Sequence, residues 1–348
     1  PSALRSADVL LVRSVTTVNQ ALLQDSSIQF VGTATIGVEH VDVEYLHKQN
    51  IGFASAPGSN ANAVSEYVLS SLLCLAETRP FSLLDKTVGI IGHGNVGSLV
   101  AEKLKSLGVS CLLNDPPRAE VDSSHRYVDL DTVLSTDILT MHVPLVTTGR
   151  YPTYRLANQA LFDRLAPDAI FINTSRGNVV DESALLDKLS SQPEFNAVLD
   201  VWQNEPNINL DLLQKVTLAT PHIASYSLEG KLRGTSMLYQ AVCRHFDIEA
   251  TWPATVCLPE PSLQQLGFSS SATSEEILRV ATRGCYDPRQ DDAMMRRLLW
   301  TEHREGLFDN LRKNYILRRE FDSLRIKLSG KNDQLEKTLS ELGFAVHS

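Results

Sequence analysis

Residues 85–115 begin with D-K-T-V-G-I-I-G-H-G-N-V-G and end, after a helix-like run, with V-S-C-L-L-N-D. The apolar start predicts a buried strand, and Gly92, Gly94 and Gly97 form the pattern G-x-G-x-x-G directly after it. Asp115 stands at the end of the next apolar run, which is the order that a dinucleotide-binding βαβ unit requires. The stretch therefore predicts an α/β domain that binds a nucleotide.

Each residue of this pattern has its own expected role. Gly92 allows a tight turn, Gly94 lets a pyrophosphate approach the backbone, and Gly97 lets the helix pack close to the strand. The free N–H groups at the start of that helix attract phosphate. A carboxylate at Asp115 accepts hydrogen bonds from ribose hydroxyls and repels a 2′-phosphate, so the pattern favours NAD over NADP. The alternative is a glycine-rich turn without a ligand. The cofactor-binding residues expected in the turn are Gly92, Gly94, Asn95, Val96 and Gly97.

The composition is that of an ordinary globular protein. The chain has 348 residues, 43% of them hydrophobic and 21% charged, which suggests two or three domains. A formal net charge of −9 offers no basic face for nucleic acid, and no apolar run is long enough to span a bilayer. The five cysteines are scattered without C-x-x-C spacing, so neither disulfides nor a metal site are predicted. We expect a cytoplasmic protein with no metal, nucleic-acid or membrane partner.

The first of three expected domains is formed by residues 1–82 and 225–250. Short apolar runs at 9–12, 28–31 and 51–54 predict strands of a parallel sheet, and we expect a flavodoxin-like α/β domain that binds the substrate. Two long helices are predicted at 62–77 and 227–245. Because the chain starts at Pro1, shortly before a strand-like run, this domain is expected to lack an N-terminal strand and helix.

The other two expected domains are residues 83–224 and residues 251–348. The former is predicted to be a Rossmann-type, doubly wound NAD-binding domain. Its six strands are predicted at 88–91, 110–114, 138–141, 169–173, 197–200 and 216–219. The latter is predicted to be a small α+β domain for association, with charge-rich helices around 291–299 and 308–319 and a short α/β-like tail.

Three polar motifs follow predicted strands of the second domain. They are N-T-S-R-G at 173–177, D-V-W-Q-N-E-P at 200–206 and T-P-H-I-A at 220–224. Ligands of an open parallel sheet bind beyond the carboxyl ends of its strands. We therefore expect Arg176, Glu205 and His222 to converge on one cleft.

These three side chains are suited to the oxidation of a hydroxy acid. His222 can take the hydroxyl proton because imidazole titrates near neutral pH. Glu205 can hold the other ring nitrogen and stabilise the protonated ring. Arg176 offers a planar fork to a carboxylate. Each also has a plainer explanation: a structural ion pair for Arg176, a helix cap for Glu205 and a satisfied loop histidine for His222. Their joint placement at three strand ends favours catalysis.

These motifs resemble those of the D-isomer-specific 2-hydroxyacid dehydrogenases, and the resemblance covers residues 1 to about 246. Further stretches resemble the subfamily that oxidises 4-phospho-D-erythronate at C2 in bacterial pyridoxal 5′-phosphate synthesis. They are L-V-R-S-V-T at 11–16, F-V-G-T-A-T at 30–35, S-A-P-G-x-N-A at 55–61, N-D-P-P-R at 114–118, P-H-I-A-x-Y at 221–226 and L-R-K-N-Y-x-x-R-R-E at 311–320.

The resemblance implies NAD as the cofactor and a homodimer formed through the C-terminal extension. It implies that Arg176 and Glu205 are catalytic and that His222 donates a proton in the reductive direction. The implied NAD contacts are Asp115, Val143 through its backbone, Asp200 and Ser225, although position 225 is usually glycine. The implied substrate contacts are Ser14, Thr35 and Tyr226.

The residues themselves suggest how a phosphorylated substrate is held. Arg13 and Ser14 end a predicted strand, and residues 32–35 form a loop of small residues after the next strand. Our hypothesis is that this loop binds the carboxylate and that Arg13 or an arginine of the tail meets the phosphate. Arg13 is equally compatible with a surface ion pair. Two alternative functions remain: another D-2-hydroxyacid dehydrogenase of the phosphoglycerate or hydroxypyruvate type, and a non-catalytic NAD-sensing binding protein.

Overall fold

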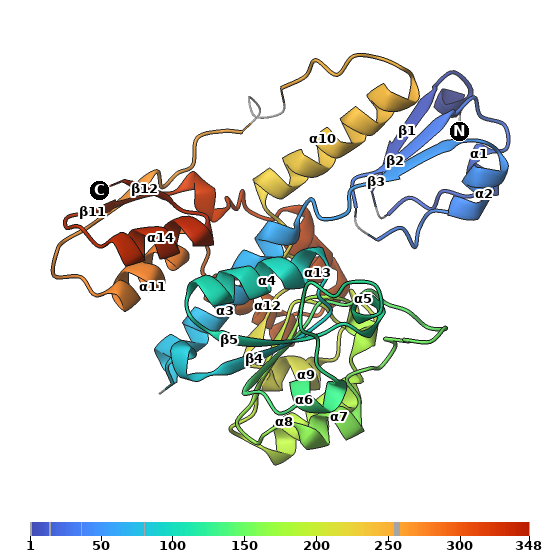
Figure 1. Cartoon of the computed structure of the whole chain (residues 1–348). Coiled ribbons are helices and arrows are strands. Elements are labelled where there is room, and N and C mark those ends of the chain that lie inside the picture. Colours follow the sequence, from blue (N-terminus) through green and yellow to red (C-terminus); the bar gives the residue numbers. More distant parts are fainter. Residues whose placement is uncertain (1, 14, 36, 80, 254–257, 348) are drawn as a thin grey trace. The chain divides into compact units, whose positions relative to one another are not determined.

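The computed structural model describes residues 2–13, 15–35, 37–79, 81–253 and 258–347 (Figure 1). The chain divides into two compact units. The first unit comprises Pro1–Asn62 and Tyr226–Glu260, and the second comprises Ala63–Ser225 and Pro261–Ser348. No helix among the described residues is long and apolar enough to cross a membrane.

The first unit is built on a parallel sheet of three strands in the order β1-β2-β3. The strands are β1 (Val9–Val12), β2 (Phe30–Thr33) and β3 (Gly52–Ser55). All three strands lie within two residues of their predicted positions. A flavodoxin-like sheet has the strand order 2-1-3-4-5, so three strands that neighbour each other in chain order correspond to its strands 3, 4 and 5. The helices of this unit are η1 (Ser2–Arg5), α1 (Gln20–Leu23), α2 (Val43–Lys48) and α10 (Leu228–His245). Of these, α10 packs against β2 and β3.

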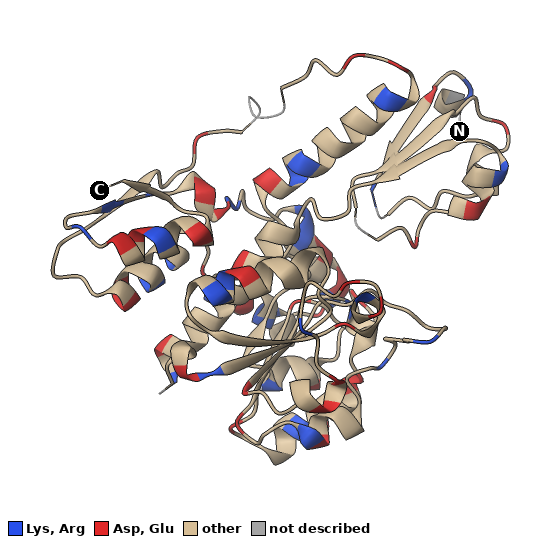
Figure 2. Ribbon diagram, viewed as in Figure 1, with Lys and Arg blue, Asp and Glu red and all other residues tan. Residues whose placement is uncertain are grey.

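The second unit contains the predicted doubly wound sheet of six parallel strands, in the order β5-β4-β6-β7-β8-β9. The strands are β4 (Thr87–Ile91), β5 (Ser110–Asn114), β6 (Ile138–Met141), β7 (Ile170–Asn173), β8 (Asn196–Leu199) and β9 (Leu218–Ala219). None of them carries a charged residue, as Figure 2 shows, which is typical of a sheet covered on both faces. The strand order reverses between β4 and β6, so this is the switch point where such folds bind ligands.

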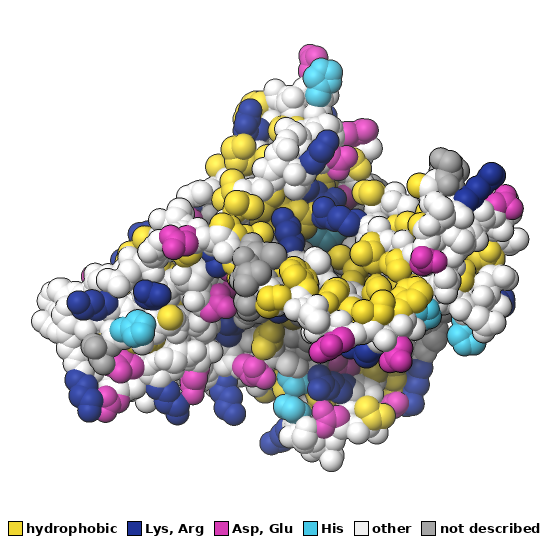
Figure 3. Space-filling view, turned by 90° about the horizontal axis from the view of Figure 1, so that it is seen from above, with side chains coloured by type: hydrophobic (Ala, Val, Ile, Leu, Met, Phe, Trp, Pro, Cys, Tyr) yellow, Lys and Arg dark blue, Asp and Glu magenta, His cyan; other side chains and the backbone are white. Residues whose placement is uncertain are grey.

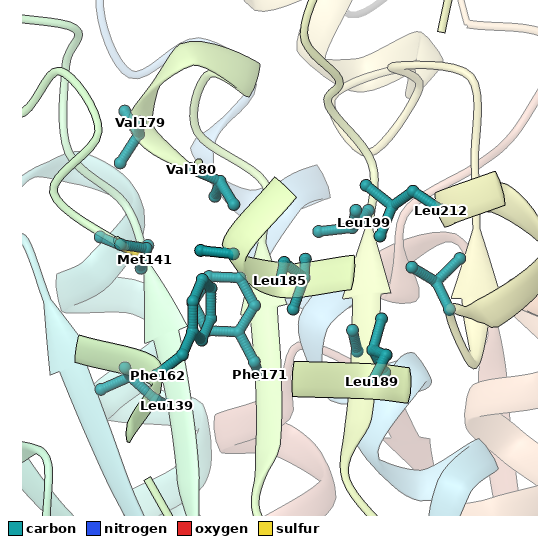
Figure 4. Packing of buried hydrophobic residues seen from close by; sticks show 14 of the residues in the cluster. Leu139, Met141, Phe162, Phe171, Val179, Val180, Leu185, Leu189, Leu199 and Leu212 are labelled. Atoms are coloured by element: carbon teal, nitrogen blue, oxygen red, sulfur yellow. The ribbon is translucent and has the colours of Figure 1, made fainter. Parts of the chain in front are cut away.

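Helices cover this sheet and bury its side chains. Those between the strands are α4 (Asn95–Ser106), α5 (Pro116–Ala119), α6 (Leu130–Val133), α7 (Gln159–Arg164), η3 (Gly177–Val179), α8 (Glu182–Ser191) and α9 (Leu210–Lys215), preceded by α3 (Ala61–Thr78) and η2 (Leu83–Asp85). Figure 4 shows Phe162 of α7 packed edge-on against Phe171 of β7, with ring centroids 5.2 Å apart. Each fully buried side chain of this size contributes about 1.5–3 kcal/mol relative to an exposed one.

The C-terminal segment belongs to the second unit and has its own parallel sheet, in the order β10-β11-β12. Its elements are β10 (Gln265–Phe268), α11 (Ser274–Cys285), α12 (Pro288–Met295), η5 (Arg296–Trp300), α13 (Arg304–Lys313), η6 (Phe321–Ser323), β11 (Arg325–Leu328), α14 (Asp333–Leu342) and β12 (Ala345–His347). This segment combines helices and strands, as predicted, and all its strand pairs are parallel. The prediction missed β10, whose sequence Q-L-G-F is only partly buried and gives no continuous apolar run.

This segment also completes the edge of the six-stranded sheet. The carboxylate of Asp292 in α12 accepts the N–H of Ala219 in the edge strand β9 at 2.8 Å. Arg296 donates to the carbonyls of Leu213 and Val216, both at 2.9 Å. An open N–H of the edge strand and two carbonyls at the end of α9 are therefore satisfied by side chains of the C-terminal segment.

Candidate active site

The glycine-rich turn follows β4 and has the geometry that its sequence predicted. Gly92 has a φ of +91°, a conformation that side chains disfavour. A Cβ at Gly97 would lie 1.9 Å from the carbonyl oxygen of Gly92, so only glycine lets α4 pack this closely. A Cβ at Gly94 would meet no described atom within 4 Å. The backbone at Gly94 is therefore open to a ligand, beside the uncapped N–H groups of Asn95 and Val96 at the start of α4, and this turn fits a pyrophosphate.

Asp115 lies directly after β5, beside this turn. Its carboxylate accepts the backbone N–H of His93 at 2.8 Å and that of Arg118 at 3.1 Å. The guanidinium of Arg118 donates to the carbonyl of His93. Asp115, which is predicted to bind the ribose, is thus also the residue that joins the glycine-rich turn to the start of α5.

His222 and Glu205 form the contact that the sequence predicted. The Nδ1 atom of His222 lies 2.8 Å from Oε2 of Glu205, and Oε1 of Glu205 accepts the backbone N–H of Trp202 at 2.9 Å. Burial raises the pKa of Glu205, but the hydrogen bond and charge of His222, the N–H of Trp202 and the charge of Arg312 together outweigh burial, so the pKa of Glu205 is lowered. His222 has a φ of +57°, a strained value of the kind that concentrates at active sites.

Asp200 holds the loop that carries His222. Its buried carboxylate accepts the hydroxyl of Thr220 at 2.6 Å and the N–H groups of Ile223 and Ala224 at 2.8 and 3.0 Å. Its carbonyl accepts the N–H of His222 at 2.7 Å. Burial raises the pKa of Asp200. In this structure Asp200 fixes the loop that carries His222, and a contact of Asp200 with NAD stays a prediction.

Arg176 follows β7 and is half-buried. Its guanidinium donates to the carbonyl of Ser175 at 2.9 Å. The next residue, Gly177, packs so closely on the loop of Glu205 that a Cβ there would lie 1.9 Å from the carbonyl oxygen of Trp202. The loops that carry Arg176 and Glu205 are therefore in direct contact.

Glu182 ties the same two loops together, and the sequence reasoning missed it. Its carboxylate accepts the backbone N–H of Gln203 at 2.7 Å, and the side chain of Gln203 donates to the carbonyl of Val180 at 2.9 Å. Burial raises the pKa of Glu182 to about 7. The sequence signal was only an acidic residue in the first turn of a helix, which usually indicates a favourable helix-dipole contact.

Val143 lies after β6, at the switch point. A Cβ at Gly92 would lie 2.9 Å from its side chain and 2.6 Å from the carbonyl oxygen of His142, so these backbones adjoin. His142 lies between the hydroxyls of Thr140 and Thr174 at 2.9 and 3.1 Å, and burial lowers its pKa to about 3. Ser225, the last predicted cofactor contact, is the final residue of this stretch of the second unit.

The predicted substrate contacts Thr35, Arg13 and Tyr226 belong to the first unit, and Ser14 lies outside the described residues. The hydroxyl of Thr35 lies 2.7 Å from that of Thr33 and donates to the carbonyl of Gly37 at 2.8 Å.

Lys231, which the sequence reasoning missed, adds a positive charge beside two of these residues. Its ammonium lies 5.2 Å from the ring centroid of Tyr226. Burial and then the charge of Arg13 lower the pKa of Lys231. These two cations repel each other in the first unit, and an anion between them would relieve the repulsion.

Comparisons with known proteins agree with this geometry. Residues 74–224 match the family described as D-isomer specific 2-hydroxyacid dehydrogenase, NAD binding domain, and residues 257–343 match a domain of unknown function, DUF3410. The erythronate-4-phosphate dehydrogenase of Marinobacter nauticus is 46% identical over an alignment of 349 positions, which covers 99% of this chain and 91% of that protein. That of Proteus mirabilis is 44% identical over 342 residues, 98% of this chain and 90% of that protein.

Solved structures share the fold. The NAD-dependent formate dehydrogenase of Staphylococcus aureus in complex with NAD has a TM-score of 0.56 and 25% identity, over 73% of this chain and 83% of that one. The D-lactate dehydrogenase of Aquifex aeolicus, complexed with NAD and lactic acid, has a TM-score of 0.57 and 24% identity, over 71% and 85%. This chain belongs to the D-isomer-specific 2-hydroxyacid dehydrogenase family, among the erythronate-4-phosphate dehydrogenases, and residues 74–224 form its NAD-binding domain.

Proposed function

We propose that this protein oxidises 4-phospho-D-erythronate with NAD to (R)-3-hydroxy-2-oxo-4-phosphooxybutanoate, a step in the biosynthesis of pyridoxal 5′-phosphate (vitamin B6). The observation that carries the proposal is the His222–Glu205 pair, 2.8 Å apart. The pair follows β8 and β9 at the same edge of the parallel sheet as the glycine-rich turn after β4. The identity of 46% with a relative that bears this enzyme name supports the choice of substrate.

The residues of the site divide the chemistry between them. The Nδ1–H of His222 donates to Glu205, so Nε2 is free of a proton and accepts the one that leaves the C2 hydroxyl. Glu205 then stabilises the imidazolium, as a carboxylate does for a histidine base. NAD, when bound, accepts the hydride that leaves C2. Arg176 pairs with the substrate carboxylate and polarises the forming carbonyl group.

In this proposal the first unit supplies the contacts to the rest of the substrate. Thr35 and its loop bind the carboxylate end, and Ser14 and Tyr226 are further contacts. Arg13 and Lys231 bind the 4-phosphate, because Lys231 lies beside Tyr226 and the charge of Arg13 acts on Lys231. An arginine of the tail remains the other candidate for the phosphate, but Arg318 is not available, because it is only 3% exposed and both of its terminal nitrogens donate to backbone carbonyls.

The proposal includes a cytoplasmic homodimer formed through the C-terminal segment. The most exposed large apolar side chains of this segment are Trp300 at 87%, Leu317 at 68% and Ile316 at 65%. We propose that a partner copy covers them, since large exposed apolar patches mark interaction surfaces. The four described cysteines are free, in keeping with a reducing compartment. On the face in Figure 3, positive and negative side chains are interspersed, which gives no support to a nucleic-acid partner.

The test is the appearance of NADH absorbance when the protein is mixed with NAD and 4-phospho-D-erythronate, with 3-phosphoglycerate and D-lactate in parallel. A burst counts as a signal, because the product can stay bound. We expect a burst with the phosphoerythronate only, and its loss in His222→Ala but not in His47→Ala, which alters an exposed histidine of α2. A burst with another acid would retain the family and discard this substrate. No burst despite measured NAD binding would favour a non-catalytic NAD-binding protein.

A further inference from the structure

Arg318 belongs to the C-terminal motif L-R-K-N-Y-x-x-R-R-E, which has no role in the proposed reaction. The chain passes between its two compact units three times, after Asn62, after Ser225 and after Glu260. We call the first two of these passages the crossings. One terminal nitrogen of Arg318 donates to the carbonyl of Ala63 at 2.6 Å, and the other donates to the carbonyl of Ala224 at 3.2 Å. A single side chain therefore binds the backbone at both crossings, on the side of the second unit.

The surroundings of Arg318 are built to hold a buried cation. The guanidinium carbon lies 4.1 Å from the ring centroid of Tyr286, a cation–π contact. Burial alone would lower the pKa of Arg318, but Tyr315, Tyr286, Glu66 and other neighbours raise it. Removing one partner of such a buried ionic group leaves the others uncompensated. Arg318 is therefore a fixed part of the structure at the two crossings.

The contact with Ala224 links Arg318 to the catalytic loop. Ala224 stands two residues after His222, and its peptide groups are held from two directions. Its N–H donates to the carboxylate of Asp200 at 3.0 Å, and its carbonyl accepts from Arg318. Asp200 also accepts the N–H of His222 through its own carbonyl. The position of His222 thus depends on a loop that Arg318 holds at its far end.

We propose that Arg318 is a positioning residue: it clamps both crossings between the units and, through Ala224, orients His222 for proton transfer. The C-terminal segment then fixes the chain at the two crossings, on the side of the second unit, in addition to any part it has in association. The kinetic side of this proposal rests on the proposed dehydrogenase function, whereas its structural side does not.

Arg296 offers a matched control for the test. It lies in the same C-terminal segment and also donates to two backbone carbonyls of the NAD-binding domain, those of Leu213 and Val216 at 2.9 Å. These carbonyls lie at the end of α9, in neither the crossings nor the loop of His222. Arg318→Met and Arg296→Met therefore remove equivalent anchors at different places.

The first measurement is hydrogen–deuterium exchange of the full chain saturated with NAD. In Arg318→Met we expect exchange at least about 10-fold faster in peptides covering 60–66 and 220–228, because the backbone there loses its clamp. In Arg296→Met we expect faster exchange around 210–218 only. The second measurement is steady-state kinetics, where Arg318→Met should lower kcat about 10- to 100-fold with little change in KM for NAD, as misplaced catalytic groups do, while Arg296→Met stays within about twofold.

Arg318→Lys keeps the charge but lacks the fork that reaches two carbonyls, so it should exchange at the crossings nearly as fast as Arg318→Met. It also carries the test if Arg318→Met does not fold. Equal effects of the Arg318 and Arg296 variants on exchange, or an unchanged kcat in the Arg318 variants, would overturn the proposal. If exchange at the crossings is fast in Arg318→Met but the wild-type protein shows no turnover, the result would support the clamp and reject the proposed reaction.

Discussion

Glu182 is a buried carboxyl group behind the loop of Glu205. Burial raises its pKa from 4.5 to about 7, so between these values the folded state holds a proton that the unfolded state has lost, and stability falls as pH rises. Glu182→Gln keeps an acceptor for Gln203 without the charge. We expect it to raise the free energy of unfolding by on the order of 1–3 kcal/mol at pH 8 and by little at pH 4. Urea unfolding at both pH values checks this, with the exposed Asp187→Asn as control. A gain that does not depend on pH would contradict it.

Asp115 determines the cofactor if its carboxylate meets the adenosine ribose. Removing the charge removes the repulsion of a 2′-phosphate, so Asp115→Ala should raise the ratio of kcat/KM for NADP to that for NAD by about tenfold or more. Glu120→Ala is the control, because Glu120 is an exposed carboxylate of the same segment that pairs with Arg150. An unaltered ratio in Asp115→Ala would remove Asp115 from the cofactor site.

At the scale of elements, two glycines of the turn between β4 and α4 have different roles: Gly97 is needed for packing, and Gly94 is predicted to be needed for binding. In Gly97→Ala the new Cβ would collide with the carbonyl oxygen of Gly92 at 1.9 Å, so α4 must move, and we expect a loss of about 2 kcal/mol or more of stability. In Gly94→Ala the Cβ meets no described atom within 4 Å, so stability should change by less than about 0.5 kcal/mol. NAD affinity should nevertheless fall at least about tenfold, since the methyl group enters the path of the pyrophosphate. Denaturant unfolding and an NAD titration test both; full affinity in Gly94→Ala would place the phosphates elsewhere.

At the scale of the whole molecule, the proposed dimer assigns a role to the exposed apolar side chains of the C-terminal segment. If Leu317, which is 68% exposed, lies in a dimer interface, Leu317→Asp buries an unpaired charge there and should weaken the dimer by about 2 kcal/mol or more. Val121→Asp is the control, because Val121 is 86% exposed but lies outside that segment. Sedimentation across a range of concentrations gives the dissociation constants. A monomeric wild type, or equal dimers in all three proteins, would reject this interface.

The sequence by itself determined the six-stranded sheet, the glycine-rich turn and the pairing of His222 with Glu205. The strands of this sheet are short apolar runs between turn residues, so their positions can be predicted from residues that are neighbours in the sequence. The turn could be predicted because Gly92 and Gly97 answer local steric demands of the chain, while Gly94 leaves the backbone open to a ligand. The pair at His222 followed from a general property of parallel sheets, whose strands all end at one edge.

Only the tertiary structure decided β10, Glu182 and Arg318. The strand β10 is half-exposed, and its four residues give no continuous apolar run. An acid at the start of a helix looks the same in sequence whether it faces water or, like Glu182, a loop 21 residues away. Arg318 binds carbonyls that are 94 and 255 residues distant along the chain. Local patterns extend over a few residues, whereas such contacts depend on which segments the whole fold brings together, and that physical difference separates what was predicted from what was not.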